Sequence, residues 1–247
     1  MPVVTLVGNV GNVAFLFTVK RIPRMRTVAN MYLVNLAVAD VLFLNITCAA
    51  YLWTYVTTPV IRSQSYNSPV WCWLIFYPSH MCYYASLQIV TLVSFERYTA
   101  ICHPIKHRRF GTKRRTKQQI AICWIVAVIL SAFPTFKVGD LQSLTLCIRS
   151  LTNDDSRMEA VIVTISYCQN SFALFWFTLI DKFILGVLFL AAMISSSFAY
   201  VNIIQALSKR EGSNLQSDQD NNNSNIRKQV AIILIANGMI FFICQIP

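Results

Sequence analysis

Long runs of apolar residues, separated by short polar stretches, set the pattern of this chain. A bilayer core about 30 Å thick is crossed by a helix of about 20 apolar residues, and six runs approach that length. They lie at residues 2–19, 28–56, 71–104, 118–136, 173–207 and 229–247. The first begins at the initiator methionine and the last stops at Pro247 inside an apolar run, so we expect both to be incomplete. The pattern predicts an all-α transmembrane helix bundle.

Composition agrees with a place in the lipid bilayer. Hydrophobic residues make up 55% of the 247 positions and charged residues 13%, whereas about 25% is charged in a typical soluble domain. The formal net charge is +11, but the basic residues fall in short runs between apolar spans, which argues against nucleic-acid binding. No basic stretch and no small-residue cleavage site precede the first span, so we predict no cleavable signal peptide.

The polar loops carry unequal charge, which predicts the orientation. Fifteen of the 21 Lys and Arg residues follow the first, third and fifth spans, and such loops stay in the cytoplasm. The N-terminus is therefore expected outside the cell. The outer loop 137–172 contains the β-prone run LTL at 144–146, which predicts a short hairpin. The inner segment 208–226 is rich in Ser, Asn, Gln and Asp, which predicts a disordered connection.

The inner end of the third span carries charges that are costly in a membrane. Residues 94–105 read SFERYTAICHPI, and a charged pair at the end of an apolar helix is expensive unless it has a role. Cys72 and Arg97 are 25 residues apart, about 38 Å of helix, so this span crosses the whole membrane. Ser79, Ser86 and Arg97 share one helical face. The alternative for Arg97 is a side chain that snorkels to lipid headgroups.

Asp40 is the only carboxylate of the second span. A charge at bilayer depth costs about 2.5–3.5 kcal/mol unless it meets partners, water or an ion. The functional interpretation is a cation site, and the alternative is an Asp that is protonated or hydrogen-bonded for packing.

The eight cysteines match no zinc-binding spacing. With the orientation assigned, the cysteines that face the oxidising compartment are Cys72, Cys147 and Cys168. One disulfide among these three is expected to tie the outer loop to the third span, and three free thiols are the alternative.

The motifs of the spans, taken together, resemble those of the rhodopsin-like (class A) G-protein-coupled receptors. The residues that carry the resemblance are Gly11-Asn12, LAVAD ending at Asp40, Cys72, Glu96-Arg97-Tyr98, Trp124, Tyr200, Phe241 and Pro247. Within that family, MRT at 25–27, MYLVNLAVAD at 31–40, ERYTAICHPIK at 96–106 and RKQV at 227–230 are most similar to receptors for thyrotropin-releasing hormone and related neuropeptides. The resemblance implies a seven-helix receptor fold in a single domain over residues 1–247, with six spans present.

This resemblance implies roles for particular residues. Cys72 would pair with Cys147. A sodium ion, and no other cofactor, would bind in a polar network of Asn12, Asp40 and Ser86. The residues that would contact a heterotrimeric G protein or rearrange on activation are Glu96, Arg97, Tyr98, Ile101, Pro104, Ile105 and Tyr200. Tyr200 would swing toward Arg97, and a packing switch below the ligand pocket would contain Phe241 and Pro247, in the sixth span that moves outward during signalling.

Several positions depart from the usual pattern of the family. Ala192 replaces the kink proline of the fifth span, and Gln245 replaces the tryptophan of the CWxP motif. Arg227 stands where some members have an acid that holds the third-span arginine, so that lock cannot form. Ser79 lacks the carboxylate that anchors amine ligands, which argues against a biogenic-amine receptor. Because the seventh span is missing, we expect the 247 residues alone to fold poorly and not to signal.

An extracellular peptide is the ligand that the resemblance implies. Candidates to line its pocket lie near the outer ends of the third and fifth spans: Ser79, His80, Tyr83, Tyr84, Asp181 and Lys182. A structural role explains each of them equally well.

Two other classes of protein fit the sequence less well. A transporter or channel would have charged residues in several spans, of which this chain has few, and a transporter often has a repeated half, of which it has none. For an enzyme, the chain has no GxSxG, HExxH or phosphate-binding glycine loop. The sequence therefore predicts a multi-pass receptor of the plasma membrane.

Overall fold

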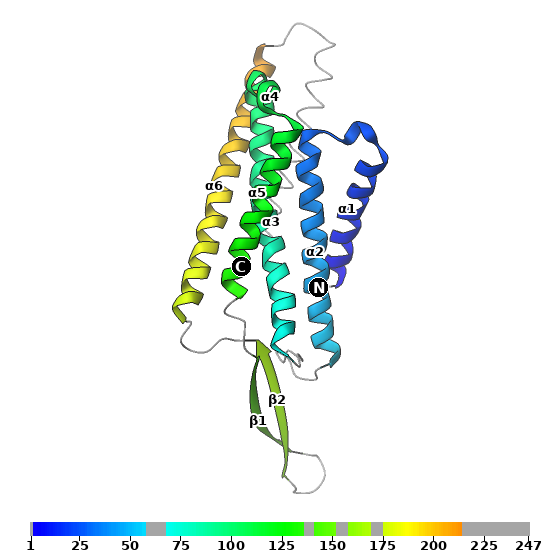
Figure 1. The fold of residues 1–247 in the computed structure, drawn as a ribbon, viewed down its shortest axis with the longest axis vertical. Helices are drawn as coiled ribbons and strands as arrows, with labels where there is room; N and C mark the ends of the chain where they lie inside the picture. The colour runs from blue at the N-terminus through cyan, green and yellow to red at the C-terminus, as the bar shows by residue number, and fades with distance from the viewer. Residues whose placement is uncertain (1, 58–67, 136–140, 152–157, 169–174, 214–247) are drawn as a thin grey trace. The chain divides into compact units, whose positions relative to one another are not determined.

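The computed structural model describes residues 2–57, 68–135, 141–151, 158–168 and 175–213 (Figure 1). Its helices are α1 (Pro2–Arg21), α2 (Val28–Thr57), α3 (Pro69–Cys102), α4 (Pro104–Phe110), α5 (Lys113–Thr135) and α6 (Phe175–Ser213), with a short 3-10 turn at Pro23–Met25 and two strands, β1 (Leu141–Leu151) and β2 (Met158–Cys168). Helices α1, α2, α3, α5 and α6 correspond to the first five expected spans, but α3 ends at Cys102, before the expected end at residue 104, and Pro104 starts α4. The sixth expected span, 229–247, lies outside the described residues.

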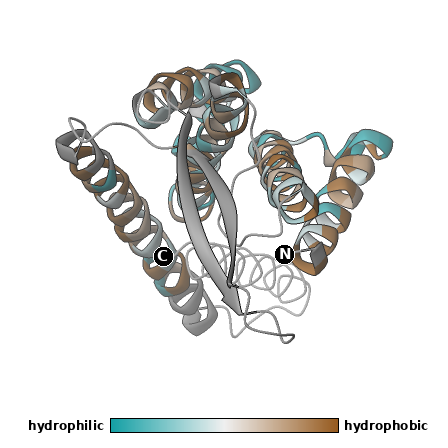
Figure 2. Cartoon of the chain, turned by 90° about the horizontal axis from the view of Figure 1, so that it is seen from below, coloured by the Kyte–Doolittle hydropathy of each residue, from teal (hydrophilic) through white to brown (hydrophobic). Residues whose placement is uncertain are grey.

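Three helices of the described ranges are both long and apolar enough to cross a membrane: Val3–Arg21, Val28–Thr57 and Lys182–Ala206. Helices α3 and α5 have sufficient length, at 34 and 23 residues, but α3 carries many polar side chains and α5 begins with basic residues. Hydrophobic residues run along the helices (Figure 2), and many large ones are exposed, among them Val4, Val7 and Phe17 of α1. In a bilayer these side chains meet lipid instead of water.

Prolines set two of the helix boundaries. Helix α1 ends at Arg21 because Ile22 precedes Pro23, and the residue before a proline favours extended backbone. The φ and ψ angles of Ile22 are −105° and 102°. At the end of α3, Pro104 begins α4 at the first helical position, where its missing N–H removes no helical hydrogen bond.

Gly111 ends α4 through a close approach of backbone atoms. Its N–H donates to the His107 carbonyl oxygen at 2.7 Å. A Cβ atom at this position would lie 2.7 Å from the same oxygen, so a larger residue here would force the backbone to move.

Strands β1 and β2 form the hairpin that the sequence predicts in the outer loop (Figure 1). They are antiparallel and each has eleven residues. The register places Leu141 opposite Cys168 and Cys147 opposite Ile162.

The disulfide predicted between Cys72 and Cys147 is wrong in this structure. Cys72 of α3 is bonded to Cys168, with the two Cα atoms 5.9 Å apart. The hairpin register explains the difference: Cys168 is paired with the first residue of β1, and Cys147 lies six residues further along that strand, about 20 Å away. Because bridged cysteines need Cα atoms within about 7 Å, the end of β2 supplies the partner.

Helix α6 is longer than expected. The disordered connection predicted at 208–226 is therefore wrong for residues 208–213. It has 39 residues and continues to Ser213. Leu207, Lys209, Arg210 and Glu211 are strong helix formers, so the helix extends past the apolar span until Gly212-Ser213. Residues 214–226 lie outside the described part of the chain.

The chain divides into two compact units, each built from parts of several helices. The first comprises residues 1–11, 40–84 and 127–183. Within it the amides of Asn9 and Asn45 exchange two hydrogen bonds, of 3.3 and 3.0 Å. The second comprises residues 12–39, 85–126 and 184–247, and its core includes Leu87, Val90 and Ala192.

Ala192, which replaces the expected proline, lies in an uninterrupted helix. It is buried against a cluster of α3 side chains that contains Leu87 and Val90. A small residue lets two helices approach closely, so the alanine supports direct packing of α6 on α3 within the second unit.

Candidate functional site

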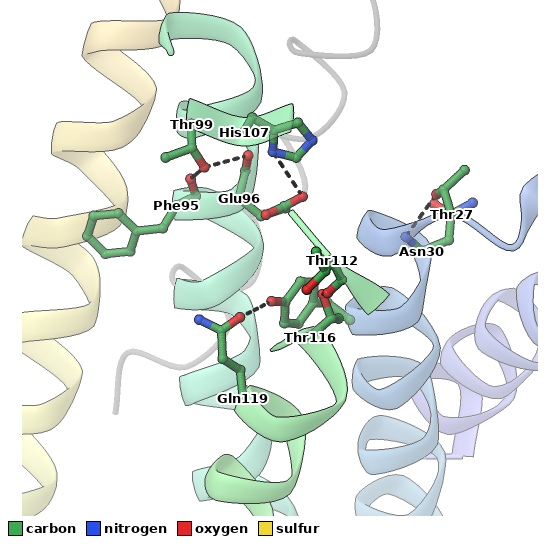
Figure 3. A network of polar contacts seen from close by, with 10 residues as sticks. Thr27, Asn30, Phe95, Glu96, Thr99, His107, Thr112, Thr116 and Gln119 are labelled. Carbon is green, nitrogen blue, oxygen red and sulfur yellow. Dashed lines mark hydrogen bonds and ion pairs between the residues drawn. The ribbon is translucent and has the colours of Figure 1, made fainter. Parts of the chain in front are cut away.

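The second unit brings the charged end of α3 against α4. The Glu96 carboxylate lies 3.5 Å from Nδ1 of His107, and the imidazole is directed at that carboxylate (Figure 3). Helix α4 follows α3 after a single residue, His103, so the turn at Pro104 folds His107 back over Glu96. Both side chains are largely shielded from solvent, with 14% of Glu96 and 29% of His107 exposed.

Arg97 is half-buried beside this contact. Its Nε atom is buried and has no hydrogen-bond partner within the described ranges. An unsatisfied buried donor costs about 1–3 kcal/mol, and such a group needs an explanation in a folded protein. The structure therefore holds a cationic donor in place without satisfying it fully.

Tyr200 of α6 lies against α3 one helical turn before Arg97. A hydrogen bond of 2.9 Å joins its Oη atom to Ser94 Oγ, and Ser94 is fully buried. The Tyr200 ring packs in a cluster with Ile203, and Tyr98 and Ile101 of α3 pack on this cluster. Tyr200 is thus bonded to Ser94, which precedes Arg97 by three residues. Arg97 is the residue toward which Tyr200 is expected to swing on activation.

The remaining predicted coupling residues divide between the packed cluster and the surface. Ile101 is half-buried on the Tyr200 cluster. Tyr98 has its hydroxyl 3.2 Å from Nε2 of His103. Pro104 and Ile105 belong to α4, and Ile105 is 85% exposed.

A pocket of about 280 Å³ opens beside the Glu96–His107 contact. Four helices of the second unit form it, with these lining residues: Tyr32, Leu92, Phe95, Glu96, Thr99, Lys106, His107, Gly111, Arg115, Thr116 and Gln119. The hydroxyl of Tyr32 donates to Gln119 Oε1, and Figure 3 shows Gln119 and Thr116 on α5 near Glu96 of α3. Trp124 of α5 also donates to Asn35 of α2, at 3.3 Å.

The residues predicted to bind sodium lie on three helices: Asn12 on α1, Asp40 on α2 and Ser86 on α3. Ser86 is buried, while Asn12 and Asp40 are half-buried. Asp40 belongs to the first unit and the other two belong to the second, so their grouping stays a prediction from the sequence.

Four candidate ligand residues lie together on α3 in the first unit. Ser79 and His80 each contact the carbonyl oxygen one turn back, at 2.7 Å. Tyr83 and Tyr84 stack edge to face with centroids 5.9 Å apart, and Tyr84 is 2% exposed. Burial of this kind fits packing better than direct ligand contact for Tyr84. Lys182 of α6 is exposed.

Several predicted residues cannot be placed. Phe241 and Pro247 of the packing switch, and the departures at Arg227 and Gln245, lie outside the described residues, as does the side chain of Asp181.

Sequence reasoning missed two partners that the structure supplies: His107, which meets Glu96, and Ser94, which meets Tyr200. Cys168, which is bonded to Cys72, was one of the three cysteines expected to face the oxidising compartment, but the resemblance implied Cys147 instead. Pro104 was a usable signal for the first partner, because a proline at the end of the expected third span predicts a new helix start there. Ser94 belongs to the SFERY stretch itself, so a polar residue one turn before Arg97 was also visible.

Comparison with known proteins identifies the family of the chain. The profile of the family described as "7 transmembrane receptor (rhodopsin family)" matches residues 11–247. The thyrotropin-releasing hormone receptor of Ovis aries is 31% identical over 97% of this chain and 61% of its own length. The motilin receptor of Homo sapiens is 40% identical over 54% of this chain and 31% of its own, and somatostatin receptor type 5 of Bos taurus is 31% identical over 56% and 36%. The matched part of the chain covers between about one third and three fifths of the length of each of these relatives.

Proposed function

Because the chain belongs to the rhodopsin family of seven-transmembrane receptors, we propose that it binds an extracellular peptide and activates a heterotrimeric G protein through the inner end of α3. Family membership makes it a multi-pass protein of the plasma membrane and a receptor, which sets aside the transporter and channel alternatives. The family is one of receptors and not of enzymes.

The observation that carries the proposal is the arrangement around Arg97. Its Nε atom is buried and unsatisfied within the described ranges, while Tyr200 is held one turn away by Ser94. A peptide agonist that binds one bundle conformation more tightly shifts the equilibrium toward it. In that conformation Tyr200 leaves Ser94 and its hydroxyl accepts from Arg97, whose side chain then faces the G protein.

The exposed face of α4 supplies the second part of the coupling surface. Ile105 is 85% exposed on a seven-residue helix, and a single apolar side chain that fills a partner's pocket often dominates binding energy. The contact between His107 and Glu96 holds this helix on α3, so the position of Ile105 depends on the same residues that surround Arg97.

Asn12, Asp40 and Ser86 are the residues that would hold a sodium ion. Their carboxylate, amide and hydroxyl oxygens are ligands that hard cations prefer. Sodium chloride would then raise the melting temperature of the purified receptor more than choline chloride does. Asp40→Asn would abolish that difference, and an unchanged difference in Asp40→Asn would exclude the site.

The proposal is tested in cells that express the full-length protein. The relatives' names supply the first panel of peptides: thyrotropin-releasing hormone, motilin and somatostatin. At least one peptide of a wider neuropeptide panel should stimulate G-protein nucleotide exchange, and Arg97→Ala should abolish the stimulation while peptide binding remains. Peptide binding without any exchange, or exchange that survives Arg97→Ala, contradicts the proposal.

A further inference from the structure

The lining of the pocket beside the Glu96–His107 contact includes two cationic and two large apolar side chains, together with polar ones. Lys106 of α4 and Arg115 of α5 form the cationic part, and both are exposed. Leu92 and Phe95 of α3 form the apolar part, and Phe95 is 39% exposed. A lining of this kind suits an occupant that is anionic at one end and apolar at the other.

The charges within the pocket favour an anion despite one carboxylate. Glu96 is the acidic residue of the lining, and His107 Nδ1 lies 3.5 Å from it. Lys106 and Arg115 bring two permanent positive charges against this one carboxylate. Lysine offers three N–H donors and arginine five, which suits the several oxygens of a phosphate group.

The position of the pocket along the chain places it at the cytoplasmic side of the membrane. Its cations belong to the loop between the third and fourth spans, where seven Lys and Arg residues fall between 106 and 117. Such loops lie at the inner membrane surface, whose leaflet carries the anionic lipids, and basic pockets between helices on that side bind lipid headgroups.

We propose that this pocket binds an anionic phospholipid of the cytoplasmic leaflet. The lipid phosphate lies between Lys106 and Arg115, and the acyl chain runs along Leu92 and Phe95 toward the bilayer. An acidic segment of a partner protein matches the cations but not the exposed Phe95 ring, which is why the lipid is favoured.

The test uses the full-length protein in nanodiscs of phosphatidylcholine that contain phosphatidylserine. Bound phosphatidylserine is counted by native mass spectrometry for the unchanged protein and for the double variant Lys106→Gln, Arg115→Gln. The matched control is Lys113→Gln, Arg114→Gln, which removes the same charge from exposed residues of the first turn of α5 that do not line the pocket. The pocket variant should weaken binding about fivefold for each lost cation, and the control should change it less than twofold.

A second measurement needs no variant. A photoactivatable phosphatidylserine in the same nanodiscs should label the α3 peptide around Phe95 more strongly than the exposed Phe198 region of α6. Equal loss of lipid in both double variants, or equal labelling of α3 and α6, would show adsorption to the loop and overturn the proposal. Unchanged lipid binding together with weaker binding of purified G protein in the pocket variant would assign the cations to a protein partner, which also overturns it.

Discussion

The Glu96 carboxylate of α3 lies 3.5 Å from Nδ1 of His107 in α4. The carboxylate next to Arg97 in sequence is therefore engaged by the following helix, while the guanidinium Nε has no hydrogen-bond partner in the described part of the chain. Arg227 also stands where some members of the family have an acid that holds this arginine, so we expect Glu96 to be the carboxylate for which His107 and Arg97 compete.

Removal of the histidine should strengthen the resting state. In His107→Ala the Glu96 carboxylate is released and can pair with Arg97. An ion pair of this partly exposed kind contributes about 0.2–1 kcal/mol, so agonist-independent nucleotide exchange in membranes should fall by up to about fivefold. Lys117→Ala, an exposed position on α5, is the control and should leave basal exchange unchanged. An increase in His107→Ala would show that Glu96 does not restrain Arg97.

The bond between Ser94 and Tyr200 should be measurable as a coupling energy. Ser94→Ala and Tyr200→Phe each remove one partner of a buried 2.9 Å hydrogen bond, which contributes about 0.5–1.5 kcal/mol. Thermal unfolding of the two single variants and the double variant should give a non-additive term of that size. Ser195→Ala removes a hydroxyl that bonds within α6, to the Ala192 carbonyl at 3.1 Å, and should show no coupling with Tyr200→Phe. Additive effects of Ser94→Ala and Tyr200→Phe would mean that the bond does not form.

The disulfide should follow the hairpin register. Peptide mapping under non-reducing conditions should recover Cys72 linked to Cys168. Cys72→Ser and Cys168→Ser should lower surface expression equally, because loss of a native disulfide costs about 2–5 kcal/mol. Cys147→Ser should leave the cross-link intact. A Cys72 peptide linked to Cys147 would contradict this pairing.

The buried alanine of α6 should not accept a larger side chain. Ala192 packs on Leu87 and Val90, and an overpacked core costs about 1–3 kcal/mol. Ala192→Leu should therefore lower the melting temperature of the purified protein. The neighbouring Ala191 is exposed, so Ala191→Leu adds the same atoms toward lipid and should be neutral. Equal tolerance at both positions would argue against direct packing of α6 on α3.

Hydropathy predicted the helical framework because it acts locally: a run of about 20 apolar residues has few alternatives in a bilayer. The boundaries that Pro23 and Pro104 set were not predicted, and the third span was expected to continue to residue 104. The family resemblance, drawn from motifs such as Glu96-Arg97-Tyr98, is confirmed by the family match over residues 11–247.

The partners of the site residues depend on geometry that local patterns do not contain. Cys168, and not Cys147, pairs with Cys72 because of the register of two eleven-residue strands. A β-prone tripeptide predicts a strand but does not specify that register. His107 reaches Glu96 only because α4 folds back after His103. Helix α6 extends to Ser213 because the residues after its apolar span include strong helix formers. The prediction of a disordered connection gave more weight to the polar residues around them.

Nucleotide exchange on a purified heterotrimeric G protein tests the central claim most directly, with the full-length receptor in nanodiscs compared with Arg97→Ala and Glu96→Gln. We expect Glu96→Gln to raise agonist-independent exchange above that of the unchanged receptor, and Arg97→Ala to reduce it to the level of empty nanodiscs. Exchange in Arg97→Ala that equals that of the unchanged receptor would contradict the assignment of the inner end of α3 as the coupling site.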